Sequence, residues 1–256
     1  MKRYIAELKN LSLRYHTKSG ETLAVDDISF KIYENEFLSL IGPSGCGKST
    51  VLSLISGIIK PSDGEIYFND KFSSEENLIG YMLQKDCLFE WRNIEQNVLL
   101  GLEINKKLND KTRTNALNLL EKYGLGSFLN HYPSQLSGGM RQKAALVRTL
   151  AFGPKLLLLD EPFSALDYQT RTIISNEIKK IIEKENKTAV LVTHDISEAI
   201  SLSDRILIFS SRPGKIEKEL KINFGEKKYS ALEKRKNSKF NKYFEIVWDK
   251  MPKIIN

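Results

Sequence analysis

Apolar residues recur along the chain in two alternating patterns. Short runs rich in β-branched residues are followed by longer stretches with helical spacing, an order that predicts parallel strands covered by helices. The first such unit is a strand at 37–41, a glycine-rich turn and a helix at 48–56 that ends at Gly57. Turn residues at 61–64 close the unit.

The strand pattern is interrupted in the middle of the chain. Strands are predicted at 65–68 and 79–83, with turn residues at 69–70 between them. From 93 to about 150 the pattern becomes helical, which predicts an inserted helical subdomain. Strand character then returns in four further segments, at 155–160, 188–193, 205–210 and 215–220.

Two stretches have one apolar helical face each. The first is an amphipathic helix with isoleucines at spacings i, i+4, i+7 and i+8, namely Ile174, Ile178, Ile181 and Ile182. The second lies near the C-terminus and combines Phe240, Tyr243, Phe244, Val247 and Met251. We expect this second face to pack on the main body, and a partner surface is the alternative.

Composition excludes several classes of protein. A chain of 256 residues with 41% hydrophobic residues can build a packed core, so disorder is not its main state. Its longest apolar runs are far shorter than the roughly 18 to 20 residues of a membrane span. Two cysteines form no disulfide framework, and the first ten residues contain no apolar signal segment, so we expect a reducing cytoplasm.

The chain is modestly basic. Lysine and arginine outnumber aspartate and glutamate by 39 to 32, a net charge of +7 with a pI near 9.1. Such a balance suits a polyanionic partner without proving one. Much of the excess lies near the C-terminus, at Lys227, Lys228, Lys234, Arg235, Lys236, Lys239 and Lys242. Two interpretations explain this basic cluster: a solvated helix face, or contact with anionic lipid headgroups or a partner.

The glycine-rich turn fits the P-loop pattern G-x-x-x-x-G-K-[ST] between a predicted strand and a predicted helix. Its glycines let backbone N–H groups turn toward a phosphate, and the helix adds its positive dipole end. Lys48 would neutralise the β and γ oxygens, and Ser49 would bind Mg2+. The matching positions are Gly42, Pro43, Ser44, Gly45, Cys46, Gly47, Lys48 and Ser49.

A second motif is a predicted buried strand of four leucines that ends in Asp160 and Glu161. Beside the P-loop strand, Asp160 would reach Mg2+ through water, and Glu161 would polarise the attacking water. Without a P-loop in the same chain, the two acids would be an ordinary strand end. Together the two motifs predict nucleotide hydrolysis.

A third motif, L-S-G-G-M-R-Q at 136–142, opens a predicted helix and forms a second anion-binding helix start. A second such start is redundant unless another phosphate site exists. At these residues the chain resembles the ATP-binding subunits of ATP-binding cassette (ABC) transporters, whose signature begins L-S-G-G. The resemblance covers essentially the whole chain.

The resemblance implies an α/β fold of the P-loop NTPase class, an ABC-type nucleotide-binding domain with a mixed sheet core and an inserted helical subdomain. It implies one domain over 1–256. Its RecA-like core would cover about 1–90 and 153–225, its helical subdomain about 91–152, and a C-terminal helical tail about 226–256.

The resemblance also implies a dimer that clasps two ATP molecules, with ATP and Mg2+ as cofactors. In such a pair, Ser137, Gly138 and Gly139 of one copy touch the γ-phosphate held by the other, and Asp167 of the D-loop lies at the interface. Met140 stands where many members have glutamine, on the helix rather than in the phosphate cradle. A homodimer is expected because this one chain carries both halves of the site.

The remaining roles are carried over position by position. Gln84 matches the Q-loop glutamine, His194 the switch histidine, and Tyr15 the aromatic residue stacked on adenine, for which Tyr4 is an alternative. The implied catalytic residues are therefore Glu161, His194, Gln84 and Lys48. The implied Mg2+ ligands are Ser49, Gln84 and, through water, Asp160. The ATP-binding set comprises Tyr15, the P-loop and Thr50.

Two features point to an importer. The segment 88–92 carries Phe89 and Trp91 where the family receives the coupling helix of a permease, although anchoring in the core is an alternative. The same tryptophan and the S-R-P-G segment at 211–214 resemble the nitrate/sulfonate/taurine branch, and thiamine-precursor importers look similar. Glu90 departs from the proline common there.

The resemblance thus implies the energy-coupling ATPase of an importer at the cytoplasmic face of the cell membrane. Its partners would be a separate integral membrane permease and, indirectly, an extracytoplasmic substrate-binding protein that selects the solute. The alternative is a soluble ABC ATPase acting on nucleic acid or ribosomes, but these usually carry two cassettes, so no nucleic acid partner is expected. A GTP switch is disfavoured because the sequence at 186–189 lacks the aspartate that selects guanine.

Overall fold

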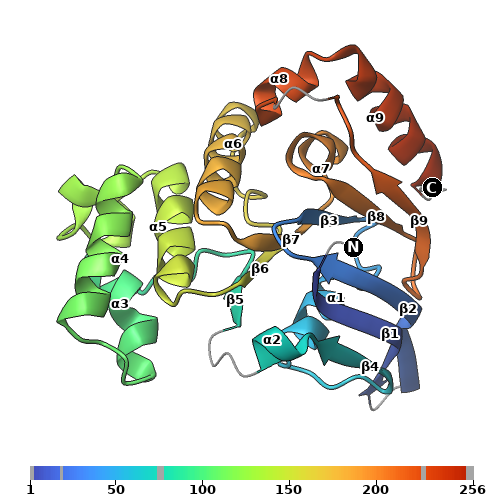
Figure 1. Cartoon of the computed structure of the whole chain (residues 1–256), viewed down its shortest axis with the longest axis horizontal. Coiled ribbons are helices and arrows are strands. Elements are labelled where there is room, and N and C mark those ends of the chain that lie inside the picture. Colours follow the sequence, from blue (N-terminus) through green and yellow to red (C-terminus); the bar gives the residue numbers. More distant parts are fainter. Residues whose placement is uncertain (1–2, 18–19, 74–77, 226–228, 252–256) are drawn as a thin grey trace. The chain divides into compact units, whose positions relative to one another are not determined.

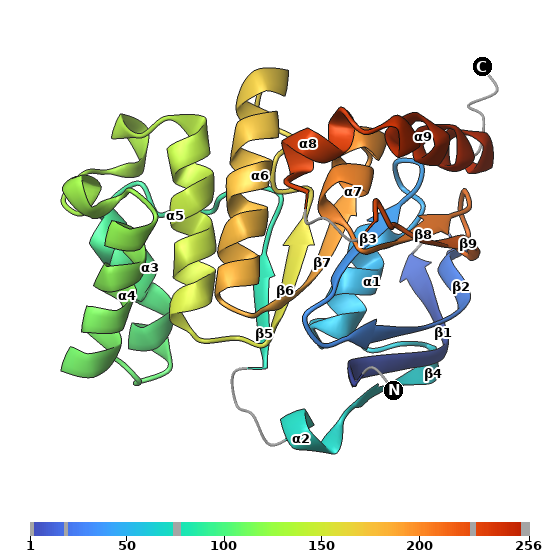
Figure 2. The same ribbon diagram turned by 45° about the horizontal axis from the view of Figure 1, so that its top comes forward.

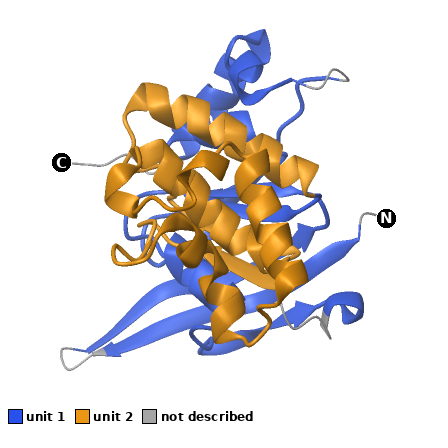
Figure 3. Ribbon diagram, turned by 90° about the vertical axis from the view of Figure 1, so that its left-hand side faces the viewer, with its two compact units in different colours: residues 1–75, 186–256 blue, residues 76–185 orange. Residues whose placement is uncertain are grey.

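The computed structural model describes residues 3–17, 20–73, 78–225 and 229–251. The chain forms two compact units, 1–75 with 186–256 and 76–185, which we call unit 1 and unit 2 (Figure 3). Among the described residues, no helix combines the length and apolar character that crossing a membrane requires.

Unit 1 contains an antiparallel sheet that the sequence pattern did not predict. Its strands are β1 (Tyr4–Thr17), β2 (Gly20–Tyr33) and β4 (Asp63–Phe68), in the order β2-β1-β4. Leu8 of β1 pairs with Phe30 on one side and Ile66 on the other. The turn expected at 61–64 was wrong in part, because β4 already begins at Asp63 to complete this pairing.

Four strands of unit 1 form a mixed sheet in the order β7-β3-β8-β9. β3 (Phe37–Ile41), β7 (Thr188–Thr193) and β8 (Arg205–Phe209) are parallel, and β9 (Ile216–Lys221) is antiparallel to β8. Every residue of the three parallel strands is buried, as expected for a sheet covered on both faces. The sequence predicted all four strands to within one residue at each end.

The described part of unit 1 also contains helices (Figure 1). They are α1 (Lys48–Ile55), the short α2 (Asp70–Ser73), α7 (Ile196–Leu202), α8 (Ala231–Arg235) and α9 (Ser238–Lys250). Helix α7 packs on β3 and β7, and α9 packs on α7 (Figure 2). The turn predicted at 69–70 was wrong in part: Asn69 lies between β4 and α2, but helix α2 already begins at Asp70.

The apolar face of α9 packs on the main body, as predicted. Phe240 and Val247 are buried in one cluster with Ile41 and Ile200, and Tyr243 packs against the same cluster. The basic cluster nearby is partly bound within the fold. The Lys234 ammonium lies 5.6 Å from the centre of the Phe224 ring, the Arg235 Nε atom donates to Ser201 Oγ at 3.1 Å, and the Lys239 Nζ atom donates to the Asn223 carbonyl at 3.4 Å. Lys227 and Lys228 lie outside the described residues.

Unit 2 combines two parallel strands with a helical cluster. β5 (Ile79–Met82) pairs with β6 (Leu156–Asp160), and α6 (Tyr168–Lys184) follows β6. The cluster contains α3 (Ile94–Ile104), α4 (Asp110–Lys122) and α5 (Gly138–Ala151), with single 3-10 turns at Gly126–Phe128 and Pro133–Gln135. This is the helical stretch that the sequence predicted.

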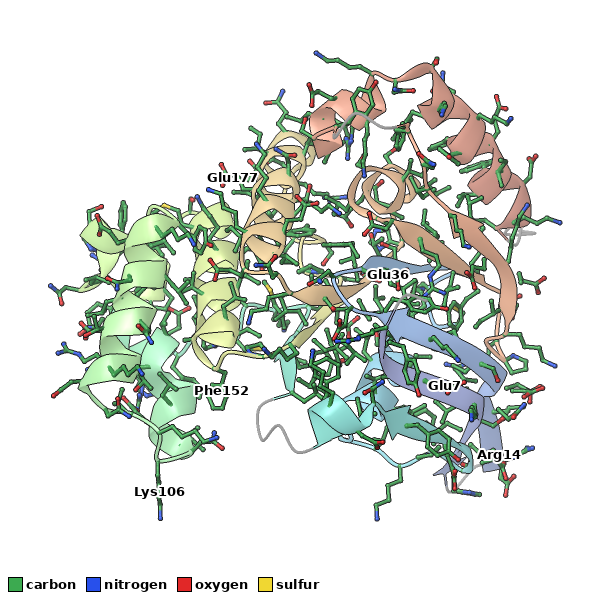
Figure 4. The ribbon with its side chains drawn as sticks, in the orientation of Figure 1. Glu7, Arg14, Glu36, Lys106, Phe152 and Glu177 are labelled. Atoms are coloured by element: carbon green, nitrogen blue, oxygen red, sulfur yellow. The ribbon has the colours of Figure 1, made fainter. Side chains whose placement is uncertain are left out.

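Local sequence explains where the helices of unit 2 begin. Asn93 and Asn109 cap α3 and α4, and each accepts a backbone hydrogen bond from the third helical residue. The apolar faces of α3, α4 and α5 meet in a core that includes Ile94, Leu120 and Val147. The Phe152 ring, labelled in Figure 4, packs against Gly101 of α3.

Truncation of Leu120 tests this core. Leu120 is fully buried, so Leu120→Ala removes buried apolar area and leaves a cavity. We expect a loss of about 2 to 5 kcal/mol in the free energy of unfolding, measured by urea denaturation. Ile104, which is 70% exposed at the end of α3, is the control. Ile104→Ala should change stability by less than about 0.5 kcal/mol. Equal losses in the two variants would contradict the packing described.

Candidate functional site

The P-loop of unit 1 connects the end of β3 to the start of α1 and folds around its own lysine. The Lys48 Nζ atom donates to the carbonyls of Gly42 at 2.8 Å and Pro43 at 2.7 Å, and lies 3.5 Å from Cys46 Sγ. Lys48 is only 4% exposed. Its charge is therefore held inside the loop, where it would neutralise a phosphate that the loop surrounds.

Gly47 permits the sharp entry into α1. Its φ is +105°, and a Cβ atom at this position would lie 2.8 Å from both the Ala24 carbonyl oxygen and Val25 Cγ1. No side chain fits there without displacing the loop or β2. The glycine thus brings the loop against the antiparallel sheet and fixes the direction of its amides.

The S-R-P-G segment at 211–214 also contacts the P-loop. The Arg212 Nε atom donates to the Gly45 carbonyl at 3.2 Å, and the Gly214 amide donates to the Ala24 carbonyl at 2.9 Å. A Cβ atom on Gly214 would lie 2.1 Å from the Cys46 carbonyl oxygen. The sequence singled out this segment only for its resemblance to one branch, and the structure shows that it packs against the P-loop.

His194 lies at the same sheet edge as the P-loop. Ile41 pairs with Thr193 in the parallel register of β3 and β7, so the residues after both strands emerge side by side. Asp195 caps α7 by accepting the Glu198 amide at 3.0 Å, and this fixes the turn that carries His194.

Tyr15 rather than Tyr4 lies beside the P-loop helix. The Tyr15 hydroxyl is 3.4 Å from Thr50 Oγ1, and its ring is 42% exposed. Tyr4 instead pairs with Tyr33 at the other end of the antiparallel sheet. Unit 1 therefore brings together Tyr15, Thr50, the P-loop and His194.

Unit 2 places Gln84, Asp160 and Glu161 at one sheet edge. Met82 pairs with Leu159 in the parallel register of β5 and β6, so these three residues follow neighbouring strand ends. The Tyr81 hydroxyl donates to Asp160 Oδ2 at 3.4 Å, and Gln84 Nε2 donates to Ser164 Oγ at 3.5 Å.

Glu161 adopts an unusual backbone conformation, with φ of +43°. Its carbonyl accepts hydrogen bonds from the Ser164 hydroxyl at 3.0 Å and the Ser164 amide at 3.1 Å. A non-glycine residue in the left-handed region costs free energy and persists only where its surroundings impose it, a feature often found at functional sites.

The signature residues begin helix α5 as expected. Ser137 is its N-cap and accepts the Met140 amide at 3.3 Å, and Gly138 and Gly139 form its first turn. Arg141 ties this helix to the segment after Gln84, because its Nε atom lies 3.1 Å from Asp86 Oδ2.

Unit 2 contains a cavity of about 570 Å3. It is lined by residues of three segments: the Q-loop with Gln84, the signature helix with Gly138, Arg141 and Gln142, and the D-loop at 164–167 with Ser164. The Gln142 Oε1 atom is buried and has no hydrogen-bond partner among the described residues. These three segments, which are far apart in sequence, are therefore close together in space.

Asp167 is the N-cap of α6. Its carboxylate accepts the amides of Gln169 and Thr170, both at 3.1 Å. Hydrogen bonds from Thr170 hold the pKa of Asp167 below its ordinary value. The carboxylate therefore fixes the D-loop at the start of α6, a structural role that the resemblance did not specify.

Two residues that the sequence analysis missed hold the segment after Gln84. The Arg148 guanidinium donates to the carbonyls of Cys87 and Asp86, both at 2.6 Å, and burial lowers its pKa. The Asn97 amide group accepts from the Phe89 amide at 2.7 Å and donates to the Phe89 carbonyl at 3.0 Å and the Arg92 carbonyl at 2.9 Å. The only feature of the sequence that could have indicated this role is that Asn97 and Arg148 are polar residues within helices whose neighbouring positions are apolar.

Between these anchors the segment presents two stacked aromatic rings. The ring centres of Phe89 and Trp91 are 4.7 Å apart, and Trp91 is 73% exposed. Leu88, by contrast, is buried in the helical core. The core anchor is therefore Leu88, and Trp91 remains available at the surface.

The donors that the sequence assigned to Mg2+ are a hydroxyl, an amide oxygen and a carboxylate, on Ser49, Gln84 and Asp160 respectively. Oxygen donors of this kind suit Mg2+, which keeps several waters and binds few protein groups alongside phosphate. In the described part of the chain, no group of three or more His, Cys, Asp or Glu side chains could hold a metal ion.

The chain is similar to known proteins over most of its length. The model of the ABC transporter family matches residues 25–164. "Uncharacterized ABC transporter ATP-binding protein YtlC" of Bacillus subtilis is 46% identical over 238 residues, which cover 93% of this chain and 92% of the relative. "Taurine import ATP-binding protein TauB" of Jannaschia sp. is 36% identical over 250 residues, which cover 94% and 93%.

Solved structures give the same result. A dimeric post-hydrolysis state of the ATP-binding cassette MJ0796 with ADP and Pi matches with a TM-score of 0.71 at 34% identity, covering 85% of this chain and 99% of that one. CbiO1 from Clostridium perfringens, part of the ABC transporter complex cbiONQ, matches with a TM-score of 0.73 at 27% identity, covering 85% and 88%. These likenesses extend over both units.

Gly47 offers a direct test of the P-loop. In Gly47→Ala the new Cβ atom would clash with β2 and displace the loop, so we expect ATP to bind at least about tenfold more weakly, measured by calorimetry. Gly57 also has a positive φ, of +75°, but open space around its Cβ position. Gly57→Ala should therefore bind ATP like the wild type. Unchanged affinity in Gly47→Ala would contradict the steric argument.

Proposed function

The chain belongs to the ATP-binding proteins of ABC transporters, and from this premise we propose that it is the energy-coupling subunit of an importer, working as a homodimer on a separate permease. As a member of this family it is an ATPase. The observation that carries the proposal is the pairing of a P-loop closed on Lys48 with a second helix start, at Ser137, in the same chain.

In the proposed mechanism one copy binds ATP through its P-loop, with Tyr15 against the adenine. Lys48 neutralises the β and γ oxygens, and Glu161 acts as general base on the attacking water. Gln84 and His194 orient that water and the γ-phosphate. Mg2+, bound by Ser49, Gln84 and, through water, Asp160, would offset charge on the phosphate oxygens.

The second copy completes the site. Its Ser137, Gly138 and Gly139 present a helix start to the γ-phosphate, and Asp167 holds the D-loop at the interface. Each ATP would be held by the P-loop of one copy and the signature residues of the other, so a single copy would bind ATP and hydrolyse it slowly. Closure of the pair would assemble the donors and exclude other water.

The proposed permease contact is the stacked pair of Phe89 and Trp91. An exposed tryptophan beside a rigid anchor is typical of the residues that dominate protein interfaces. The Asn97 and Arg148 contacts link this surface to the segment that follows Gln84. A permease bound at Trp91 would thus act on the Q-loop, and the subunit would sit at the cytoplasmic face of the cell membrane.

For the transported solute we propose the nitrate/sulfonate/taurine-like or thiamine-precursor-like class, delivered by an extracytoplasmic binding protein. Relatives named as taurine import ATP-binding proteins, 34 to 40% identical, support a small organic or inorganic solute. The S-R-P-G segment and Trp91 resemble features of that branch. Selection of the solute would lie in the binding protein and the permease.

Glu161→Gln tests the catalytic assignment. We expect phosphate release to fall by a factor of about 100 or more, because the general base is lost, while ATP binding persists. The variant should form a stable dimer with saturating ATP, detected by small-angle scattering. Wild-type turnover in the variant would contradict the role of Glu161 as general base. A variant that stays monomeric with saturating ATP would contradict the site shared between two copies.

Trp91→Ala tests the permease contact. Loss of a central aromatic anchor should weaken binding to the cognate permease in detergent by about 30-fold, or roughly 2 kcal/mol. Tyr132, an aromatic residue of unit 2 that is 46% exposed and lies outside the segment 88–92, is the control. Tyr132→Ala should bind like the wild type. A permease that binds all three proteins equally would place the docking surface elsewhere.

A further inference from the structure

We propose that unit 1 carries a second ligand site, for a small oxyanion with at least two negative charges, in a cavity remote from the P-loop. The cavity has a volume of about 750 Å3, within the range of small-molecule sites. It is lined from both sheets of unit 1, and the residues that matter here are Arg3, Lys31, Asn69, Arg205, Lys221 and Asn223.

The cavity lies at the opposite end of the central strands from the P-loop. Arg205 is the first residue of β8, and Glu36 directly precedes β3, whereas the P-loop follows Ile41 at the other end of β3. At about 3.3 Å per residue, β3 alone separates the two ends by roughly 13 Å. Figure 4 labels Glu36 beside the start of β3.

A buried ion pair forms the floor of the cavity. The Glu36 carboxylate accepts from Arg205 Nε at 2.8 Å and Nη2 at 2.9 Å, and also from the Tyr33 amide at 3.1 Å. Glu219 Oε1 lies 3.3 Å from Arg205 Nη1. Burial lowers the pKa of Arg205, but the hydrogen bonds and negative charges of Glu36 and Glu219 together outweigh burial, so the pKa is raised overall. Both carboxylates are thus engaged by the protein itself.

The other acceptors around the cavity are also engaged. Asp204 Oδ2 accepts the Phe37 amide at 2.9 Å, Asn69 Oδ1 accepts the Lys71 amide at 3.2 Å, and Asn223 Oδ1 accepts the Gly225 amide at 2.8 Å. The asparagine NH2 groups are left as donors for a ligand. The cavity therefore offers mainly donors.

Two cations at the cavity are unpaired. Lys31 is engaged by Glu7 at 3.4 Å and lies over the Tyr4 ring. For the Arg3 guanidinium and the Lys221 ammonium, by contrast, no hydrogen bond or ion pair is found with any residue of 3–17, 20–73, 78–225 or 229–251. Within the same described ranges, the Asp204 carboxylate at the cavity forms no ion pair with a lysine or arginine. The remaining charge of the cavity is positive.

A ligand that satisfies these groups must supply acceptors and negative charge. Carboxylate and phosphate oxygens do both, and they form the strongest hydrogen bonds to guanidinium and ammonium groups. Arg3 and Lys221 would repel a cation, and an apolar ligand would displace water from these residues and from the two asparagines without replacing its hydrogen bonds. The proposed class is accordingly a free metabolite with several carboxylate or phosphate groups.

The test is calorimetric titration with citrate and with inorganic phosphate, in saturating ADP so that the P-loop is occupied. We expect saturable binding to the wild type and at least about tenfold weaker binding to the double variant Arg3→Gln/Lys221→Gln. Both residues are exposed, so the variant should fold, and its ADP affinity should match the wild type. Lys218→Gln, on β9 but not lining the cavity, is the matched control and should bind normally.

Absence of saturable binding of either probe up to about 10 mM would overturn the site, as would equal affinity in the double variant. Sedimentation with phosphatidylglycerol vesicles separates a free anion from a lipid headgroup. Vesicle binding should be the same in wild type and double variant, and a loss in the variant would overturn the assignment to a free ligand. None of these measurements requires a permease or ATP turnover, so they stand apart from the importer proposal.

Discussion

The enclosure of one lysine is the constraint on which the phosphate site depends. Lys48 is almost fully buried, and its ammonium donates to two backbone carbonyls and lies 3.5 Å from Cys46 Sγ. Carbonyl dipoles solvate a buried cation but do not neutralise it, so the loop retains a strong preference for an anion. The same carbonyls fix the loop's curvature. The lysine therefore shapes the cradle as well as charging it.

In unit 2 the corresponding constraint is a set of polar anchors under one segment. Arg148 holds the backbone carbonyls of Asp86 and Cys87, and Arg141 holds the Asp86 side chain. The Asn97 side chain holds the backbone of Phe89 and Arg92 in the turn that follows. These hydrogen bonds hold the backbone of residues 86–89 to the helices, so a displacement of Trp91 would be transmitted to this segment. Such a packed, hydrogen-bonded path is a physical basis for coupling.

The sequence predicted the elements that carry chemistry better than those that support them. The P-loop, Ser137 and Asp160 were predicted from fixed residue types at fixed spacings, and the structure places them at strand ends and at a helix start. The long strands β1 and β2 were missed, because their pairing contains register shifts that break simple alternation. Arg148 and Asn97 were missed because their partners are backbone carbonyls, which no side-chain pattern encodes.

The buried pair of Arg205 and Glu36 shows why stability alone does not explain this fold. Desolvating two charges offsets most of their attraction, and an apolar pair of similar volume is often as stable. An apolar pair could not form the directional hydrogen bonds that orient the neighbouring backbone. Glu36 binds the Tyr33 amide as well as Arg205, and so fixes the turn from β2 into β3. Since the P-loop follows β3 directly, a polar cluster at one end of the strand sets the position of the phosphate site at the other.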